Sequence, residues 1–302
     1  MGNSSTPNIS VVIPVKNRKE SLLRAIESVK KQTLRPDEII VVDDGSAENV
    51  KDILAKKHAD VMVLRNEKSM GAPYSRNRGW KAASSELISF LDSDDEMKPS
   101  NLLHKVELMV DQDCDLVLGS FELNENGTSH IQKFKVDNNR TLRDHLLLNS
   151  LFDARTSTFV VKKEVLEKIA FDEYLKKHQD WDLFINIDSS YKVMFSNDCD
   201  VILHISSNDR ISSKLQHDST EYFIDKNKNK VSDDAMYMFI LKMLYKSQIR
   251  NDKYGVKLYR SKLFTYAGKV SLRYEFILFL IRYKLLNVSL LQKLKTMLKA
   301  WL

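Results

Sequence analysis

Cysteine is scarce in this chain, with Cys114 and Cys199 as its two cysteines among 302 residues. Two thiols this far apart argue against a disulfide framework and against a cysteine-based zinc site, and they indicate a reducing compartment. An apolar signal segment is also missing, because the stretch from Met1 to Asn8 is polar. We therefore expect a protein that is not secreted.

Long apolar runs are lacking as well. The longest uninterrupted run near the C-terminus is the six-residue stretch 276–281, which Arg282 ends. A helix that spans a bilayer needs about 20 apolar residues, so the sequence predicts no transmembrane segment. Internal repeats and low-complexity tracts are absent too, and a hydrophobic content of 43% is typical of a globular chain.

Charge is unevenly distributed along the chain. Residues 241–302 contain 14 Lys or Arg and 2 Asp or Glu, a net charge of +12, whereas the whole chain carries +6. Residues 1–240 therefore carry a net charge of −6. A mildly acidic body thus precedes a strongly basic C-terminal part, and we expect the two parts to do different things.

The first 120 residues alternate between short apolar runs and stretches with helical spacing. Apolar runs predict strands, and apolar residues three and four apart predict helices between them. Buried strands joined by helices are typical of an α/β fold whose mostly parallel sheet is covered on both faces. The predicted strands are 9–13, 38–42, 61–64 and 87–91, and the helices include 47–57 and 72–84.

After residue 95 the pattern changes. We expect a domain over 1–218, with one half at about 8–120 and the other at 121–218, followed by a helical region over 219–302. Beyond residue 95 the predicted strands are 115–121, 157–161 and 193–196, and the predicted helices are 102–110, 163–169 and 181–187.

Acidic residues follow two of the predicted strands at their carboxyl ends, where open α/β sheets bind ligands. Asp92, Asp94 and Asp95 come directly after the fourth strand. Crowded carboxylates repel one another, and a hard divalent cation such as Mg²⁺ or Mn²⁺ relieves this repulsion. In an extended segment Asp92 and Asp94 point the same way, so both can face one metal. The alternative is a helix N-cap cluster or a solvated turn.

Two further polar segments lie near the same strand ends. Asp44 follows the second strand, where it could hydrogen-bond a nucleobase or a ribose hydroxyl; the alternative is a plain turn in which Ser46 caps the next helix. Arg76 and Arg78 lie at the start of the predicted helix 72–84. Arginine can bind phosphate oxygens in a bidentate way, and the alternative is a helix with a charged face.

Four segments, in this order and spacing, resemble the sequence blocks of family 2 glycosyltransferases of the GT-A fold. They are 9–14 (ISVVIP) with Asn17, 39–46 (IIVVDDGS), 75–79 (SRNRG) and 90–95 (FLDSDD). The resemblance is close over about residues 8–120 and looser to about residue 215. It implies the α/β nucleotide-diphospho-sugar transferase fold, with a mostly parallel central sheet flanked by helices and, here, a C-terminal helical extension.

The resemblance also implies a nucleotide-sugar donor, a bound Mn²⁺ or Mg²⁺, and inversion at the anomeric carbon. Asp94 would be the main metal ligand and Asp92 the second, while Asp44 would contact the base or the ribose. Lys16 departs from the family pattern, because an aromatic residue that stacks on the base often stands there. The residues assigned to nucleotide-sugar binding are Pro14, Val15, Asn17, Asp44, Arg76, Asp92 and Ser93.

A general base for the acceptor is implied as well. Residues 178–183 (HQDWDL) are similar to a block in which an acidic pair precedes a helix, with Gln179 in place of the usual Glu. Asp180 keeps the position assigned to the base, and an aspartate of ordinary pKa, ~3.9, can accept a proton at neutral pH. Asp182 is the rival candidate, and a helix-capping role for Asp180 stays open. Residues expected near the diphosphate are Arg210, Ser212 and Ser213. His204 could play the same part, but a lone histidine is more often a packed or surface residue.

The implied activity is transfer of a sugar from a UDP-sugar to a hydroxyl of a glycan or lipid-linked acceptor, in bacterial lipopolysaccharide, capsule or exopolysaccharide synthesis. A nucleotidyltransferase is one alternative, but its Gly-rich phosphate loop has no counterpart here, since no glycine lies between Asn3 and Asp44. A non-catalytic nucleotide-sugar-binding membrane scaffold is the other.

The basic C-terminal part mixes Lys and Arg with large apolar residues at helical spacing over 241–302. This pattern is typical of cationic amphipathic helices on an anionic membrane surface, and its density of apolar residues argues against nucleic acid as a partner. We expect a cytoplasmic protein, peripheral on the inner face of the bacterial cytoplasmic membrane. The alternative is a helical subdomain that packs on the core with a basic outer face.

Overall fold

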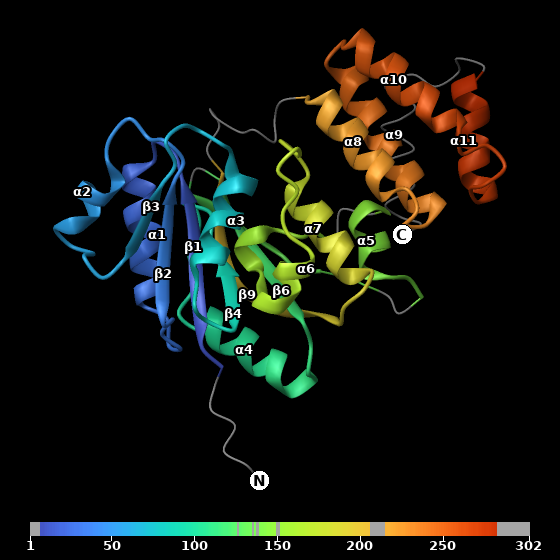
Figure 1. Cartoon of the computed structure of the whole chain (residues 1–302). Helices are drawn as coiled ribbons and strands as arrows, with labels where there is room; N and C mark the ends of the chain where they lie inside the picture. Colours follow the sequence, from blue (N-terminus) through green and yellow to red (C-terminus); the bar gives the residue numbers. More distant parts are fainter. Residues whose placement is uncertain are drawn as a thin grey trace. The chain divides into compact units, whose positions relative to one another are not determined.

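The computed structural model describes residues 7–125, 127–134, 136, 139–148, 152–205 and 215–282 (Figure 1). The chain forms two compact units. Residues 1–134 and 154–211 form the first, here called the sheet unit, and residues 135–153 and 212–302 form the second, here called the helical unit. The domain boundary at residues 218 and 219 stays a prediction.

Nine strands form one sheet in the order β3-β2-β1-β4-β8-β6-β9-β5, with β7 paired to β6. The first four strands are mutually parallel, as the sequence predicts. The strand β8 then runs antiparallel between β4 and β6, and β6 and β9 are parallel. The first strands are β1 (Ile9–Val15), β2 (Glu38–Asp43), β3 (Met62–Arg65) and β4 (Leu87–Phe90). The others are β5 (Glu96–Met97), β6 (Leu116–Glu125), β7 (Thr128–Gln132), β8 (Val160–Lys162) and β9 (Val193–Ile205).

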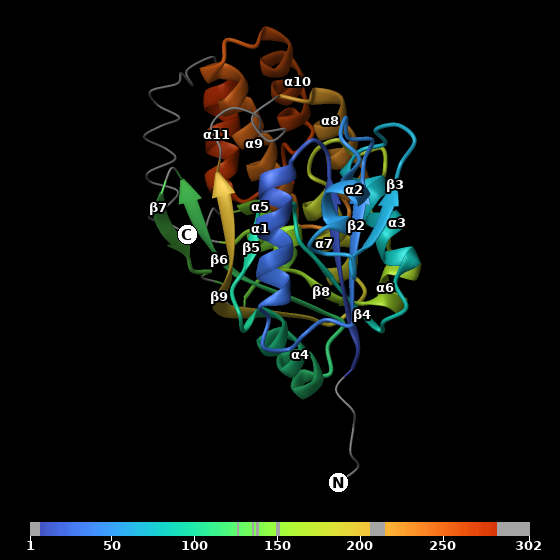
Figure 2. The same ribbon diagram turned by 90° about the vertical axis from the view of Figure 1, so that its left-hand side faces the viewer.

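Helices cover both faces of this sheet. Val11 and Ile13 of β1 pack in one core with α1 (Lys19–Lys30), α2 (Val50–Ala55) and α4 (Asn101–Gln112), and α1 lies in front of the strands in Figure 2. The neighbouring Val12 faces the other way, toward α3 (Ala72–Ala82), because successive strand residues alternate between faces. Gly79 of α3 lies so close that an added Cβ would be 2.3 Å from a Val12 methyl carbon. The strands β1 and β4 are mostly apolar because both of their faces are buried.

The second half of the sheet unit differs in detail from the prediction. The strand predicted at 193–196 continues to Ile205 as β9, through a polar segment with a register shift opposite Gly119–Phe121. Pairing with the long strand β6 overrides the low strand propensity of that segment. The sequence analysis did not predict β5 and β7. The remaining elements of the unit are the short 3₁₀ helix η1 (Thr156–Thr158), α6 (Lys163–Lys168) and α7 (Gln179–Asp188).

In the helical unit, five helices of the described residues pack around an apolar core. They are α5 (Leu142–Leu148), α8 (His217–Asn227), α9 (Asp233–Ile249), α10 (Lys253–Phe264) and α11 (Leu272–Arg282). Ser232 and Asp252 cap α9 and α10, accepting hydrogen bonds from the backbone N–H of Ala235 and Gly255. Lys242 of α9 donates to the Leu147 carbonyl of α5 at 2.7 Å. Helical structure over residues 219–282 agrees with the prediction, the remainder of which lies outside the described residues, and the pairing of α5 with α9 was not predicted. Within the described residues, no helix has the length and apolar content to span a membrane.

Candidate active site

The first two strand ends are joined by hydrogen bonds between their turns. Pro14 and Val15 are buried in β1, and Asn17 follows with a positive φ of 53°, a conformation that Asn tolerates better than most residues. The Asn17 N–H donates to Ser46 Oγ at 3.0 Å, and Asn17 Oδ1 accepts from the Ala47 N–H at 2.8 Å. The turn after β1 is thereby fixed to the turn after β2.

Asp44 is buried at this junction and accepts four hydrogen bonds. Asn66 Nδ2 and the Met70 N–H donate to Oδ1, and Ser69 Oγ and the Gly71 N–H donate to Oδ2. Burial alone would raise the pKa of Asp44, but these hydrogen bonds outweigh it and hold the pKa below its usual value. The four bonds fill the acceptor capacity of the carboxylate. A base or ribose that contacts Asp44 therefore has to replace one of them.

The acids after β4 lie in a turn, which corrects the expectation of an extended segment. The turn is closed by the Asp95 N–H, which donates to the Asp92 carbonyl at 3.0 Å. Asp95 itself is buried, and it accepts from Ser157 Oγ at 2.6 Å and from the His204 N–H at 3.3 Å. Burial, with the charges of Asp92 and Asp94, raises the pKa of Asp95 well above its usual value. Asp95 thus connects the turn to η1 and β9 through two hydrogen bonds.

Asp92 and Asp94 are each held by an arginine, and the two arginines come from opposite faces of the sheet. Arg76 of α3 contacts Asp92 at 2.5 Å, and Arg18, next to α1, contacts Asp94 at 2.5 Å. Arg24 of α1 also donates to the Asp94 carbonyl at 2.8 Å. Burial and the charge of Asp92 raise the pKa of Asp94, against the lowering effect of Arg18. Each carboxylate thus has its own arginine partner, and the charge of Asp92 is close enough to act on Asp94.

A groove of about 440 Å³ opens beside Asp94. His204, the minor candidate for a diphosphate contact, lies in this groove with its Nε2 2.6 Å from Glu96 Oε1. Arg210, Ser212 and Ser213 lie outside the described residues. The lining residues are Arg18, Ser21, Arg24, Asp94, Asn124, Gly127, His204 and Ile205.

The donor set at this turn fits a hard divalent cation. The side chains of Asp92 and Asp94 are 38% and 33% exposed, so both carboxylates can be reached from solvent. Asp95 does not qualify as a ligand, because it is buried and already bonded to Ser157 and His204. Mg²⁺ sites commonly use one or two carboxylates together with substrate phosphates. Ser93, between the two acids, is 4% exposed.

Arg76 also reaches the N-terminus of α7. Its second guanidinium nitrogen donates to Gln179 Oε1 at 2.9 Å, and its guanidinium lies 5.3 Å from the centre of the Phe171 ring. The neighbouring Asn77 holds the Phe171 backbone, donating to the carbonyl at 2.9 Å and accepting from the N–H at 3.1 Å. Helix α3 thus fixes the segment that leads into α7, and one buried arginine joins Asp92 to that helix.

Asp180 is the second residue of α7, directly after Gln179. Its side chain is partly exposed, and its Oδ1 accepts from the Trp181 N–H at 3.0 Å. Asp182 is 1% exposed. An acceptor can reach Asp180 without rearrangement of the helix, whereas Asp182 is enclosed by the core. The roles of Arg18, Arg24 and Gln179 were not predicted; the position of Arg18 directly after Asn17 in the first block was the available signal.

A second group of side chains that could coordinate a metal ion lies elsewhere in the sheet unit. His104 Nδ1 is 2.9 Å from Asp200 Oδ2 and 3.9 Å from Asp198 Oδ2. Among the described residues, this is the group in which three such side chains converge. Asp198 precedes His204 by six residues along β9, roughly 20 Å in an extended strand. The group is therefore separate from the turn at Asp92–Asp95.

Buried Lys105 lies beside this group and gives a pH-dependent prediction. Its side chain is 2% exposed and donates to Asn101 Oδ1. Burial lowers the pKa of Lys105 to about 8, against the opposing charges of Asp200 and Asp198. Between about pH 8 and about pH 10 the unfolded chain keeps a proton that the folded chain has released, so folding becomes more favourable as the pH rises.

The free energy of unfolding of the wild type, relative to Lys105→Met, should therefore increase by about 3 kcal/mol across this range. Urea unfolding of both proteins below, within and above the range measures it. Lys56→Met, which removes an exposed lysine, is the matched control and should show no such increase. A difference between wild type and Lys105→Met that is constant with pH would contradict a depressed pKa for Lys105.

Comparisons with curated proteins return glycosyltransferases. The GlyG glycosyltransferase of Streptococcus pneumoniae serotype 4 is 35% identical over 116 residues, which are 37% of this chain and 38% of GlyG. WfgD of Escherichia coli, named a UDP-Glc:alpha-D-GlcNAc-diphosphoundecaprenol beta-1,3-glucosyltransferase, is 31% identical over 141 residues, 45% of this chain and 55% of WfgD. The matched stretches thus span about half or less of these two relatives.

Among solved structures, S. aureus TarS 1–349 in complex with UDP-GlcNAc matches with a TM-score of 0.61 and 21% sequence identity, over 88% of this chain and 77% of the TarS 1–349 chain. At this identity the likeness concerns the fold, and it confirms the GT-A fold that the sequence blocks imply. The family model described as Glycosyl transferase family 2 matches residues 10–170, more than half of the chain. This chain belongs to glycosyl transferase family 2.

Proposed function

We propose that this protein is an inverting, metal-dependent glycosyltransferase that moves a sugar from a UDP-sugar to a hydroxyl of a glycan or lipid-linked acceptor. The observation that carries the proposal is the turn after β4, where two reachable carboxylates, Asp92 and Asp94, lie between Arg76 and Arg18. The names of relatives support the donor class, since WfgD is named for UDP-Glc and the TarS structure holds UDP-GlcNAc.

The nucleotide is proposed to bind across the ends of β1 and β2, with Pro14, Val15 and Asn17 lining the base pocket. Asp44 shapes the rim of this pocket through its bonds to residues 66–71, and it exchanges one of them for the base or ribose. Asp92 and Ser93 lie toward the ribose and diphosphate. Asp94 and Asp92 are the residues that would hold Mn²⁺ or Mg²⁺.

A bound divalent cation supplies Lewis-acid stabilisation of the negative charge on the leaving nucleoside diphosphate. Arg18 and Arg76 add positive charge beside the same group, in a geometry that suits phosphate oxygens. Asp180 accepts the proton of the acceptor hydroxyl as that hydroxyl attacks the anomeric carbon from the face opposite the diphosphate. Arg76 positions the general base Asp180, because it contacts both Asp92 and Gln179, the residue that precedes Asp180 in α7.

The acceptor is proposed to be carried on a lipid, as in bacterial surface polysaccharide assembly. WfgD, whose named acceptor contains diphosphoundecaprenol, supports this choice. We further propose residues 1–218 as the catalytic domain and residues 241–302 as the part that meets an anionic membrane surface, on the inner face of the cytoplasmic membrane. The excess of Lys and Arg in 241–302 supports this.

A donor panel tests the proposal. Purified protein is mixed with Mn²⁺ or Mg²⁺ and with UDP-, GDP- or dTDP-linked sugars, and the thermal shift and the release of nucleoside diphosphate are measured. UDP-sugars are expected to raise the melting temperature only with metal, and to be hydrolysed slowly without an acceptor. Donor binding that is equal with and without metal would contradict the proposal. Binding without turnover on any acceptor would favour a non-catalytic scaffold.

A further inference from the structure

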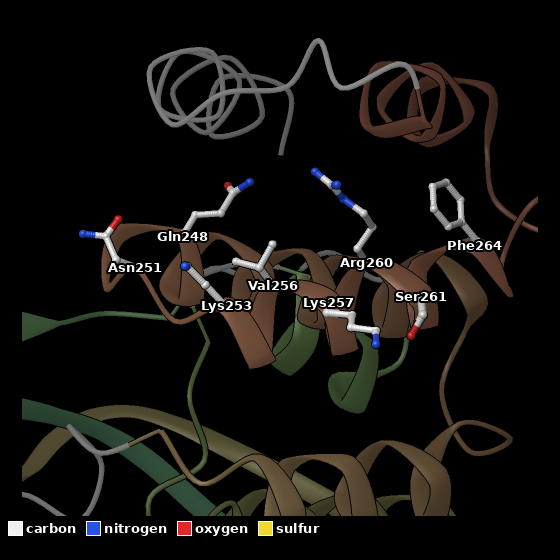
Figure 3. A pocket seen from close by; sticks show the side chains of 8 residues that line it. All are labelled: Gln248, Asn251, Lys253, Val256, Lys257, Arg260, Ser261 and Phe264. Atoms are coloured by element: carbon white, nitrogen blue, oxygen red, sulfur yellow. The ribbon is translucent and has the colours of Figure 1, made fainter.

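Helix α10 carries a row of positive charge, here called the α10 basic face, formed by Lys253, Lys257 and Arg260. Spacings of four and three residues place these side chains on one side of the helix. They line a groove of about 790 Å³ together with the apolar side chains of Val256 and Phe264. In Figure 3 the Arg260 guanidinium points away from the helix, and the two lysines extend along its flank.

No ion pair joins the α10 basic face to an acid in the part of the helical unit that the structure describes, and Arg260 Nε is buried there without a hydrogen-bond partner. Nearby acids are engaged with other side chains. Asp252 lies 2.6 Å from His217 Nε2. Lys262 contacts Glu221 at 2.9 Å and Asp225 at 3.2 Å. The three cations repel one another along the helix. Among the described residues, no acidic side chain pairs with them to offset this repulsion.

The rest of the C-terminal part adds positive charge. Residues 283–302 contain four lysines and no aspartate or glutamate, so no acidic side chain from this stretch can neutralise the face. Arg282 of α11 lies over the Phe264 ring, with its guanidinium carbon 5.8 Å from the ring centre. A fourth cation is thus held at the end of the same groove.

Helix α11 exposes an apolar stripe. Leu272, Phe276 and Phe279 are 89%, 59% and 50% exposed, and spacings of four and three residues put them on one side of the helix. A unit with unpaired cations and exposed large apolar side chains suits a lipid interface. There the lipid phosphates would contact the cations, and the edge of the acyl region would contact the apolar side chains. A nucleic acid would use the cations and leave the stripe in water.

We infer that the α10 basic face binds the phosphate headgroups of an anionic lipid bilayer. The inference rests on the membrane partner in the proposed function and names the surface that meets it. Each cation near an anionic membrane contributes a severalfold increase in binding. Loss of all three should therefore weaken binding by about a hundredfold.

Vesicle sedimentation tests this inference with the full chain. The vesicles are phosphatidylcholine alone or a two-to-one mixture with phosphatidylglycerol. Wild type should bind the mixture and ignore phosphatidylcholine, and Lys253→Gln/Lys257→Gln/Arg260→Gln should lose about a hundredfold in partitioning. The matched control is Lys31→Gln/Lys51→Gln/Lys56→Gln, which removes three exposed charges from the sheet unit and should bind within about twofold of wild type. Thermal melting of both variants verifies that they fold.

Equal losses in the two triple variants would overturn the inference, because net charge alone would then explain binding. Binding of a short single-stranded oligonucleotide as tight as vesicle binding, through the same three residues, would also overturn it. Donor hydrolysis by wild type without lipid keeps the two proposals separate. A protein that hydrolyses the donor and ignores vesicles refutes only this inference, and one that binds vesicles through α10 but uses no donor refutes only the proposed activity.

Discussion

Replacing Asp94 with Asn is expected to lower kcat for sugar transfer by about a thousandfold, a loss of about 4 kcal/mol of transition-state stabilisation. Asparagine keeps the size of the side chain but removes the charge that would hold a divalent cation beside the diphosphate. The fold should survive, because burial and the charge of Asp92 already disfavour the ionised form of Asp94. Transfer rates, Mn²⁺ binding by calorimetry and thermal melting give the three readouts.

Two variants make this result specific. Asp113→Asn removes an acid whose side chain is 96% exposed, at a positive φ of 44° that Asn also adopts, and it should leave all three readouts unchanged. Arg18→Gln removes the cation that contacts Asp94 at 2.5 Å, so Mn²⁺ should bind severalfold more tightly in the absence of donor. Mn²⁺ binding of equal strength in wild type, Asp94→Asn and Arg18→Gln would place the metal elsewhere.

The parallel half of the fold could be predicted because burial on both faces leaves a simple signal. Val11 and Val12 point to opposite faces of β1, and both are fully buried, so the strand is apolar at every position except Ser10. The continuation of β9 to Ile205 gave no such signal, since residues 197–200 (NDCD) are polar and are held in the strand by pairing with β6. Helix α5 is seven residues long and packs against a helix that begins 85 residues after it ends. Such pairing is set by tertiary packing and not by local sequence.

The sequence indicates which residues belong to the candidate site, but it does not predict which of them contact one another. The acids after β4 stand out in the sequence, yet the turn that contains Asp92 and Asp94 is supported by buried Asp95 and its bond to Ser157, 62 residues away. Arg18 and Asp94 are 76 residues apart in sequence, and Arg76 and Gln179 are 103 apart. Pairings over such distances follow from which helix covers which face of the sheet. A single sequence indicates where the strands end, but it does not determine that Arg18 pairs with Asp94 or Arg76 with Gln179.

Replacing Asp180 with Asn is expected to lower kcat for transfer by between about a hundredfold and ten-thousandfold, the range that removal of a general base produces. The amide cannot accept the proton of the attacking hydroxyl at neutral pH. Binding of the UDP-sugar should be unchanged, because Arg76 and Gln179 keep their contact. Initial rates across pH are the measurement, and the residual rate of the variant should rise with pH as hydroxide replaces the missing base.

Asp182→Asn is the matched comparison for this prediction, since it makes the same chemical change two residues further along α7. Asp182 is 1% exposed, so its substitution acts on a buried hydrogen-bonded group and should lower the melting temperature, with kcat per folded molecule within about threefold of wild type. The reverse pattern, in which Asp182→Asn abolishes transfer and Asp180→Asn retains it, would assign the base to Asp182. That outcome would also require α7 to open for the acceptor, because in the present arrangement Asp180 is partly exposed and the core encloses Asp182.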